Sequence, residues 1–177
     1  EIHERLVGSE MCIRDRIGGI MHEEERTFVA IKPDGVKRGF VGEIISRFEK
    51  KGYKLIGMKL LQVTEEIAAK HYAEHIGKPF YPNLVKYITS GPIVAMVFQG
   101  YQAVQGIRHV LGATDPCEAD VGSIRADYAQ LKAYNTVHGS DSIESAEREI
   151  NIYFKPEELC PNYKNMMELI TESVDED

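Results

Sequence analysis

Apolar and polar residues alternate in blocks along the chain, and the blocks after residue 20 predict strands and helices in turn. "TFVAI" (27–31) is β-branched and apolar and runs into the turn "KPDG", which predicts a strand. In "VGEIISRFEKKG", apolar residues recur at helical spacing, lysines occupy the last turn and Gly52 follows, which predicts a helix that ends there. "YKLIGMKLLQV" (53–63) predicts a second strand.

The middle of the chain continues the pattern. Thr64 is expected to cap a helix over "EEIAAKHYAEH" (65–75), whose two leading glutamates suit the helix dipole. "PFYPNLVKYITSG" predicts a turn and a short helix, "IVAMVFQ" a buried strand, and "QAVQGIRHVLG" a helix that ends near Gly112. "ATDPCEADVGS" has the composition of a loop. In "DSIESAEREI", Asp141 stands three residues before Glu144, so we expect Asp141 to cap another helix.

The predicted order is β-α-β-α-α-β-α, followed by a long, loop-rich segment. Strands that alternate with helices favour an α/β (α+β) single domain, in which helices cover a sheet. The ferredoxin-like split β-α-β-β-α-β arrangement, with an antiparallel sheet, fits this order best, although periodicity alone does not select it.

The first twenty residues differ from the rest. They show neither a helical nor a strand period, and "SEMCIRDR" resembles translated adapter sequence. Met21 reads as a natural start, and charges interrupt every apolar stretch before it, so no secretory signal is predicted. We expect residues 1–20 to be a non-native or disordered extension and residues 21–177 to form the domain.

Composition narrows the class of protein. The 177 residues are 43% hydrophobic and 28% charged, as in an ordinary soluble globular domain. The net charge of −7 argues weakly against a general nucleic-acid binder, but it allows a local basic cleft. Three widely spaced cysteines without a CxxC motif argue against a disulfide framework or a zinc site and favour a reducing compartment such as the cytoplasm. No apolar run approaches the length of a membrane span.

His138 stands out by its surroundings in "NTVHGSDS", at the lip of a small polar loop. Gly139 and the hydroxyl residues after it offer little bulk, and the predicted helix that follows points amide N–H groups at the loop, which suits a phosphate. His138 could act as a nucleophile, as a general base or as a metal ligand. Metal ligation is the weakest of the three, because no second histidine or cysteine lies at ligand spacing. The other five histidines, His71 among them, are expected to be structural or merely exposed.

Three basic residues could bind phosphate. Lys32 follows the first predicted strand, Arg108 lies in "GIRHVLG" and Arg125 lies in "GSIRAD", although a lone arginine most often forms a surface ion pair. The chain has neither a Walker A loop nor the motif set of protein kinases. Phosphoryl transfer here therefore requires another architecture.

Several segments together resemble one family. The family is the nucleoside diphosphate kinases, and the segments that are similar to it in order and spacing are "ERTFVAIKPDGVKRG", "KGYKLIGMKLL", "HYAEH", "KPFYPNLVKYITSGPIVAMVFQG", "VLGATDP", "GSIRAD", "NTVHGSDSIESAEREI" and "FKPEEL". The resemblance covers Glu25 to Leu159. It implies a ferredoxin-like core in a homohexamer or tetramer, located in the cytoplasm. It also implies ping-pong transfer of the γ-phosphoryl group from a nucleoside triphosphate to a nucleoside diphosphate through a phosphohistidine, with Mg²⁺ bound through the nucleotide phosphates rather than by the protein.

The resemblance also implies a role for each residue that matches a family motif. His138 would be the nucleophile, supported by Ser140 and Glu149, and Lys32 would lie near the sugar hydroxyl and the transferring phosphate. The residues that would bind the rest of the nucleotide are Tyr72, Arg108, Thr114 and Arg125 for the phosphates, Asn135 for the ribose and Phe80 for stacking on the base.

The chain departs from the family pattern at three positions. Lys132 replaces a small apolar residue beside the base, Ala126 replaces a glycine after the motif arginine, and Val121 replaces a proline before Gly122. None of these changes removes an expected catalytic group. The alternative functions are a catalytically silent nucleotide-binding scaffold on the same fold, and a histidine phosphatase or general-base hydrolase.

Overall fold

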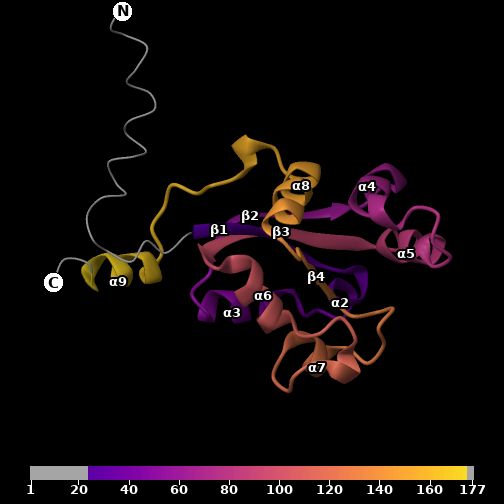
Figure 1. The fold of residues 1–177 in the computed structure, drawn as a ribbon, viewed down its shortest axis with the longest axis horizontal. Helices are drawn as coiled ribbons and strands as arrows, with labels where there is room; N and C mark the ends of the chain where they lie inside the picture. Colours follow the sequence, from indigo (N-terminus) through magenta and orange to yellow (C-terminus); the bar gives the residue numbers. More distant parts are fainter. Residues whose placement is uncertain (1–23, 175–177) are drawn as a thin grey trace, which may run out of the picture.

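One antiparallel sheet organises the protein. The structure, a computed structural model, describes residues 24–174, so the expectation for residues 1–20 lies outside the described residues. The sheet consists of β1 (Glu24–Ile31), β2 (Lys54–Gln62), β3 (Pro92–Tyr101) and β4 (Val137–Gly139), in the order β2-β3-β1-β4 (Figure 1). Each neighbouring pair in the sheet is antiparallel. This arrangement confirms the predicted ferredoxin-like sheet.

Helices cover both faces of the sheet, with α4 and α8 on one side and α3 and α6 on the other (Figure 1). The described α-helices are α2 (Pro33–Lys37), α3 (Val41–Lys50), α4 (Glu65–His71), α5 (Tyr81–Ile88), α6 (Ala103–Leu111), α7 (Ile124–Tyr128), α8 (Ile143–Tyr153) and α9 (Met166–Val174). Three short 3₁₀ helices span Ala73–His75, Pro116–Glu118 and Pro156–Glu158. Among the helices of residues 24–174, none combines the length and the hydropathy needed to cross a membrane.

Strand β1 lies between two apolar clusters. Phe28 and Ala30 point to the cluster that includes residues of α4 and α8, whereas Val29 and Ile31 point to the cluster that includes residues of α3 and α6. A strand covered on both faces needs apolar residues at every position. This explains why "FVAI" (28–31) is an unbroken apolar run.

Most predicted elements are present, and three details differ. The side chain of Thr64 accepts a hydrogen bond from the N–H of Ile67, as predicted for a cap, but α4 ends at His71 and a 3₁₀ turn follows. The cap of α8 is Ser142 rather than Asp141, because the Ser142 hydroxyl accepts from the N–H of Ser145. His138 lies within strand β4 rather than on a loop. A strand of three residues is too short to show a pattern in the sequence.

Candidate active site

The site lies where β4 pairs with β1, which brings the segment after β1 next to the segment that contains His138. Strand β4 pairs with β1 so that His138 lies opposite Ala30. Lys32 follows β1 directly, and its backbone N–H donates to the carbonyl of Thr136 at 2.8 Å. The pairing therefore brings Lys32 and His138, which are far apart in the sequence, into one small region.

His138, Glu149 and Ser140 form a hydrogen-bonded group. His138 Nε2 lies 3.0 Å from Glu149 Oε2, and the Ser140 hydroxyl donates to the same oxygen at 2.6 Å. The side chain of His138 is 24% exposed, whereas that of Glu149 is 5% exposed. Because a carboxylate can only accept, the proton of a neutral imidazole is held on Nε2. The Nδ1 lone pair is then free to react.

The charge of Glu149 is set by its neighbours. Burial by itself raises the pKa of this carboxyl, but the charge and hydrogen bond of His138, followed by smaller contributions that include the Ser140 hydroxyl, outweigh burial and lower the pKa to about 2. Glu149 is therefore ionised at neutral pH, and it can stabilise positive charge that develops on the imidazole ring.

Lys32 belongs to a second buried group. Its ammonium donates to Asn135 Oδ1 at 2.6 Å, and Asn135 Nδ2 donates to the carbonyl of Thr114 at 2.8 Å. Burial, and then the charge of Arg125, lower the pKa of Lys32 to about 8. The Thr114 side chain itself is exposed, so its hydroxyl can reach a ligand.

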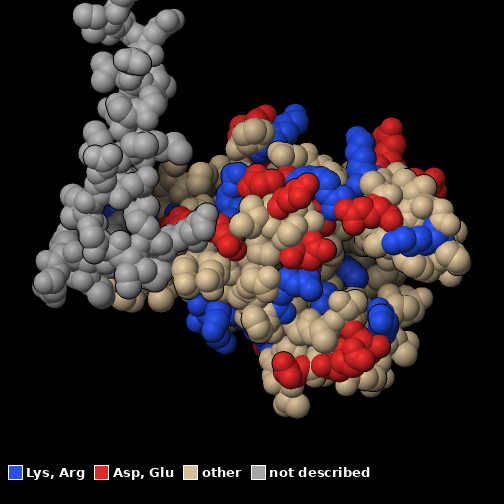
Figure 2. Space-filling model, viewed as in Figure 1, with Lys and Arg blue, Asp and Glu red and all other residues tan. Residues whose placement is uncertain are grey.

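Arg125 and Arg108 add positive charge beside the group of Lys32. Arg125 is buried and donates to the carbonyls of Gly112 and Val137 at 2.7 and 3.0 Å. Its Nε has no hydrogen-bond partner, and burial, followed by the charge of Arg108, lowers its pKa to about 10. Arg108 is exposed on α6. Figure 2 shows lysine or arginine atoms inside a hollow between the α4–α5 part and the α7 part of the surface, as expected for an anion site.

The carbonyl that accepts a hydrogen bond from Arg125 belongs to Gly112, a position that favours glycine. Gly112 has a φ of +84°, and a Cβ there would lie 2.3 Å from the Ser123 hydroxyl oxygen. A side chain at this position would therefore displace the carbonyl that receives Arg125.

Aromatic contacts connect the remaining expected residues. The ring of Tyr72 packs edge-on against His71 at 4.6 Å and stacks on His75 at 6.1 Å, and Phe80 contacts His75 at 5.5 Å. Burial, followed by the charge of Glu149, raises the pKa of Tyr72, so its hydroxyl remains a donor. Phe80 is half exposed, which leaves a ring face available for stacking.

His71 is a site residue that the sequence reasoning missed. It was expected to be structural, yet its ring lies 4.6 Å from that of His138, at an interplanar angle of 73°. Burial, followed by the charge of His138, lowers the pKa of His71 to about 3, so this imidazole is neutral. Spacing along the chain carries no signal for this contact, because only the fold brings α4 against β4.

The turn before His138 has an unusual backbone. Thr136 has a φ of +67°, and the N–H of Val137 donates back to the carbonyl of Asn135 at 2.7 Å, as in the rare γ-turn with positive φ. A β-branched residue is strained there, at a cost of about 1–3 kcal/mol. The Thr136 hydroxyl donates to Asp34 at 3.0 Å, which helps to hold the turn.

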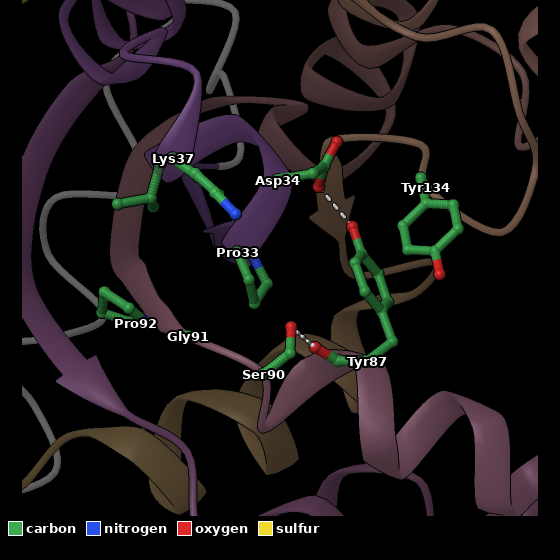
Figure 3. Close-up of a pocket in the computed structure, with 9 residues that line it drawn as sticks. Pro33, Asp34, Lys37, Tyr87, Ser90, Gly91, Pro92 and Tyr134 are labelled. Atoms are coloured by element: carbon green, nitrogen blue, oxygen red, sulfur yellow. Dashed lines mark hydrogen bonds between the residues drawn. The ribbon is translucent and has the colours of Figure 1, made fainter.

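Asp34 also lines a neighbouring cavity of about 540 Å³. The other lining residues come from α2, α5, the turn before β3 and the start of β3, together with Tyr134. Figure 3 shows the Tyr87 hydroxyl pointing at the Asp34 carboxylate, to which it donates a hydrogen bond. Tyr134 lies edge-on to Tyr87 at 4.9 Å. His138 is not among the residues that line this cavity.

The three departures from the family pattern lie at or near the surface. Lys132 is 67% exposed, and its ammonium lies 3.9 Å from Asp115 Oδ2. Val121 is fully exposed, and Ala126 donates its N–H to the Ser123 hydroxyl at 3.4 Å. None of them replaces a residue of the hydrogen-bonded groups described above.

Comparisons with known proteins agree on one family. The family model described as "Nucleoside diphosphate kinase" matches residues 25–159. A nucleoside diphosphate kinase of Bacillus thuringiensis subsp. konkukian is 58% identical over 146 residues, covering 82% of this chain and 99% of that protein. One from Thermosynechococcus vestitus is 56% identical over 137 residues, covering 77% and 91%.

Solved structures show the same similarity. A halophilic nucleoside diphosphate kinase from Halobacterium salinarum, in complex with CDP, superposes with a TM-score of 0.81 at 44% identity, over 84% of this chain and 99% of that one. A nucleoside diphosphate kinase family protein from Babesia bovis gives 0.80 at 41% identity, over 83% and 99%. The family indicated by the motifs is therefore confirmed: the chain belongs to the nucleoside diphosphate kinases and is a phosphotransferase that acts on nucleotides.

Proposed function

We propose that His138 is the residue that carries the phosphoryl group, and that it reacts through Nδ1. The observation that supports this most directly is the contact of Nε2 with Glu149, because it leaves Nδ1 as the nitrogen with a free lone pair. In the first half-reaction, Nδ1 forms a bond to the γ-phosphorus. The bond from that phosphorus to the bridging oxygen breaks, and the nucleoside diphosphate leaves with the electron pair. In the second half-reaction, a terminal oxygen of another diphosphate attacks and regenerates the imidazole.

Glu149 and Ser140 act on this step through His138. As Nδ1 bonds to phosphorus, the ring gains positive charge, which the ionised Glu149 stabilises through Nε2–H. The Ser140 hydroxyl holds the carboxylate in place. The ring therefore needs no reorientation between the two half-reactions.

The basic residues are proposed to bind the nucleotide phosphates. Arg108 is exposed on α6, and Arg125 adds a buried positive charge that interacts with it, so both suit anionic phosphates. Lys32 neutralises the transferring phosphate, while Tyr72 and Thr114 offer hydroxyls. Asn135 contacts the ribose, and Phe80 stacks on the base, which permits several bases because stacking requires no specific hydrogen bond.

Mg²⁺ is proposed to arrive with the nucleotide. The expected phosphate-binding groups are cationic or neutral, whereas Mg²⁺ prefers oxygen ligands with negative charge, so the phosphate oxygens are its natural ligands. When bound, Mg²⁺ neutralises charge that develops across the phosphates.

We further propose a homohexamer or tetramer in the cytoplasm. Strand β2 is an edge strand that exposes Met58 by 54% and Leu60 by 65%, an apolar surface that a second copy of the chain could cover. Cys117 and Cys160 are free and exposed, which suits a reducing compartment. Light scattering after size-exclusion chromatography should give the assembly size, and Leu60→Glu should reduce it.

The domain is proposed to span residues 21–177. A version that begins at Met21 should keep the activity and melting temperature of the full chain. A drop of several degrees in melting temperature would show instead that residues 1–20 contribute to the fold.

A labelling experiment tests the assignment of His138. The protein is incubated with γ-labelled ATP, the label on the protein is measured, and GDP is then added. We expect an acid-labile, alkali-stable phosphoprotein that passes its label to GDP, and no label on His138→Gln. His109→Gln, at an exposed position on α6, is the control and should behave as wild type. Release of the label to water would indicate a hydrolase, and an unlabelled wild-type protein would indicate a scaffold.

A further inference from the structure

Two side chains converge on His138 in the way that ligands of a metal ion do. His71, His138 and Glu149 each offer one nitrogen or oxygen atom, and these atoms lie within 4.8 Å of one another. The three residues come from α4, β4 and α8, so the group exists only in the folded protein. Metal ligation was the weakest prediction for His138 because no second histidine or cysteine lies at ligand spacing in the sequence, but the fold brings His71 to it.

His71 supplies an independent sign of a ligand. The residue is 6% exposed, and its Nδ1 is buried without a hydrogen-bond partner. A buried nitrogen left unpaired destabilises the folded protein, so its retention calls for a compensating interaction. The phosphoryl-transfer steps above give His71 no role.

We propose that His71, His138 and Glu149 form a site for a borderline divalent cation, with Zn²⁺ as the best match. Two imidazoles and one carboxylate, with water as the fourth ligand, are a common ligand set for Zn²⁺. Mg²⁺ prefers oxygen ligands in octahedral geometry, so it competes poorly here.

The distances suit this ion after a small adjustment. His138 Nε2 and Glu149 Oε2 are 3.0 Å apart, close to the separation of about 3.3 Å between two ligands of a tetrahedral Zn²⁺. All three ligand atoms lie within 4.8 Å of one another, so the widest pair must close by about 1.5 Å at most to reach the same value. Closing the site breaks no hydrogen bond of His71 Nδ1, because that nitrogen has no partner.

Binding at this site changes the imidazole that reacts, a consequence that rests on the proposed function. The cation takes the Nε2 lone pair of His138, so the single proton of the neutral ring moves to Nδ1. The ring keeps its charge and nothing is oxidised or reduced, but Nδ1 no longer has a lone pair for phosphorus. Zn²⁺ should therefore block phosphorylation without occupying the positions of the nucleotide phosphates.

Metal binding is measured first, on chelator-treated, nucleotide-free protein. Calorimetry should show one Zn²⁺ per chain, bound at least about 100-fold more tightly than Mg²⁺, and Co²⁺ should give the visible absorption of a four-coordinate ion. His71→Gln should weaken Zn²⁺ binding by about 10-fold or more, whereas the control His109→Gln should not. Equal affinity for Zn²⁺ in wild type and His71→Gln, or the absence of binding, would overturn the site.

A measurement on the wild-type protein keeps the inference testable if His71→Gln does not fold. In protein labelled with ¹⁵N-histidine, Zn²⁺ should shift the side-chain signals of two of the six histidines, those of His71 and His138. Shifts confined to exposed histidines would contradict the proposal.

The labelling reaction separates the two proposals. Without Zn²⁺, failure of γ-labelled ATP to label the protein would refute the transfer mechanism and leave the metal site to be judged by the binding data. With Zn²⁺ bound, labelling should slow in proportion to occupancy, excess Mg²⁺ should not restore it, and a chelator should. Unchanged labelling of the zinc-bound protein would refute the inhibitory consequence.

Discussion

Glu149→Gln isolates the contribution of one charge to phosphoryl transfer. Glu149 Oε2 receives both the Nε2–H of His138 and the hydroxyl of Ser140. A glutamine can place its amide oxygen at the same position and keep both hydrogen bonds. The substitution therefore removes the negative charge while preserving the orientation of the imidazole, so its effect measures the charge stabilisation that Glu149 provides when Nδ1 bonds to phosphorus.

The size of this effect follows from the burial of the pair. Hydrogen bonds to charged groups contribute about 1.5–3 kcal/mol and neutral ones about 0.5–1.5 kcal/mol, so the difference is about 1–2 kcal/mol. A barrier raised by that amount slows the reaction roughly 5- to 30-fold. The Glu149 side chain is only 5% exposed, so solvent screening does not reduce this estimate much.

The assay is rapid-quench measurement of phosphoenzyme formation with γ-labelled ATP at saturating concentration. Glu144→Gln removes a charge from an exposed position on the same helix and serves as the matched control, which should keep the wild-type rate. A Glu149→Gln rate within twofold of wild type would refute the role of the charge. A loss beyond about 1000-fold in a folded variant would also contradict the reasoning, because charge removal alone cannot account for it.

Three further predictions follow from the site. The pKa of Glu149 is lowered from 4.5 to about 2 in the folded state, so the ionised carboxylate stabilises the fold above pH 4.5, and this stabilisation is lost as the pH falls towards 2. It amounts to about 3 kcal/mol at most. In urea titrations at pH 7 and pH 3, the free energy of unfolding of Glu149→Gln should lack this pH-dependent contribution. Arg125→Lys keeps the charge but cannot keep both carbonyl contacts, so the transition-state stabilisation measured through kcat/KM should fall by about 2–4 kcal/mol. A wild-type kcat/KM would refute the role of Arg125 in binding phosphate. Lys132 is held near Asp115 at 3.9 Å, so any preference for GDP over ADP should be a few-fold or less, about 1 kcal/mol at most; Lys132→Val should remove it, and identical base ratios in the two proteins would leave Lys132 without a role in base choice.

The sequence predicted the strands and helices that are long enough to carry a pattern. Strands β1, β2 and β3 and the helices around them were found within a few residues of their predicted positions, and the motifs identified the family. The three residues of β4 were not recognised as a strand, because two alternations of side chains are indistinguishable from a loop. The cap of α8 was misplaced by one residue, since Asp141 and Ser142 are both good caps and local spacing does not choose between them.

The missed part of the site is tertiary in origin. From the sequence, His71 was expected to be structural or exposed like the other histidines. Its neighbour Tyr72 was assigned a role only through the resemblance to the family. What makes His71 distinctive is its burial against His138, which depends on how α4 packs over the sheet. Ligand spacing along a chain can reveal a site that is built on one helix or loop. It cannot reveal a site whose residues come from three separate elements, as this one does.

The pairing of β4 with β1 has a consequence for how the enzyme acquires its activity during folding. Only three residue pairs fix the register, Val29↔Gly139, Ala30↔His138 and Ile31↔Val137. Successive side chains of a strand face opposite ways, so a slip by one residue would turn His138 away from Glu149. The two strands are also separated by most of the folded chain, and contacts between distant segments form slowly because a long loop must close first. Catalytic competence therefore depends on the closure of one short strand in the correct register, because the pairing of β4 with β1 is what places His138 beside Glu149.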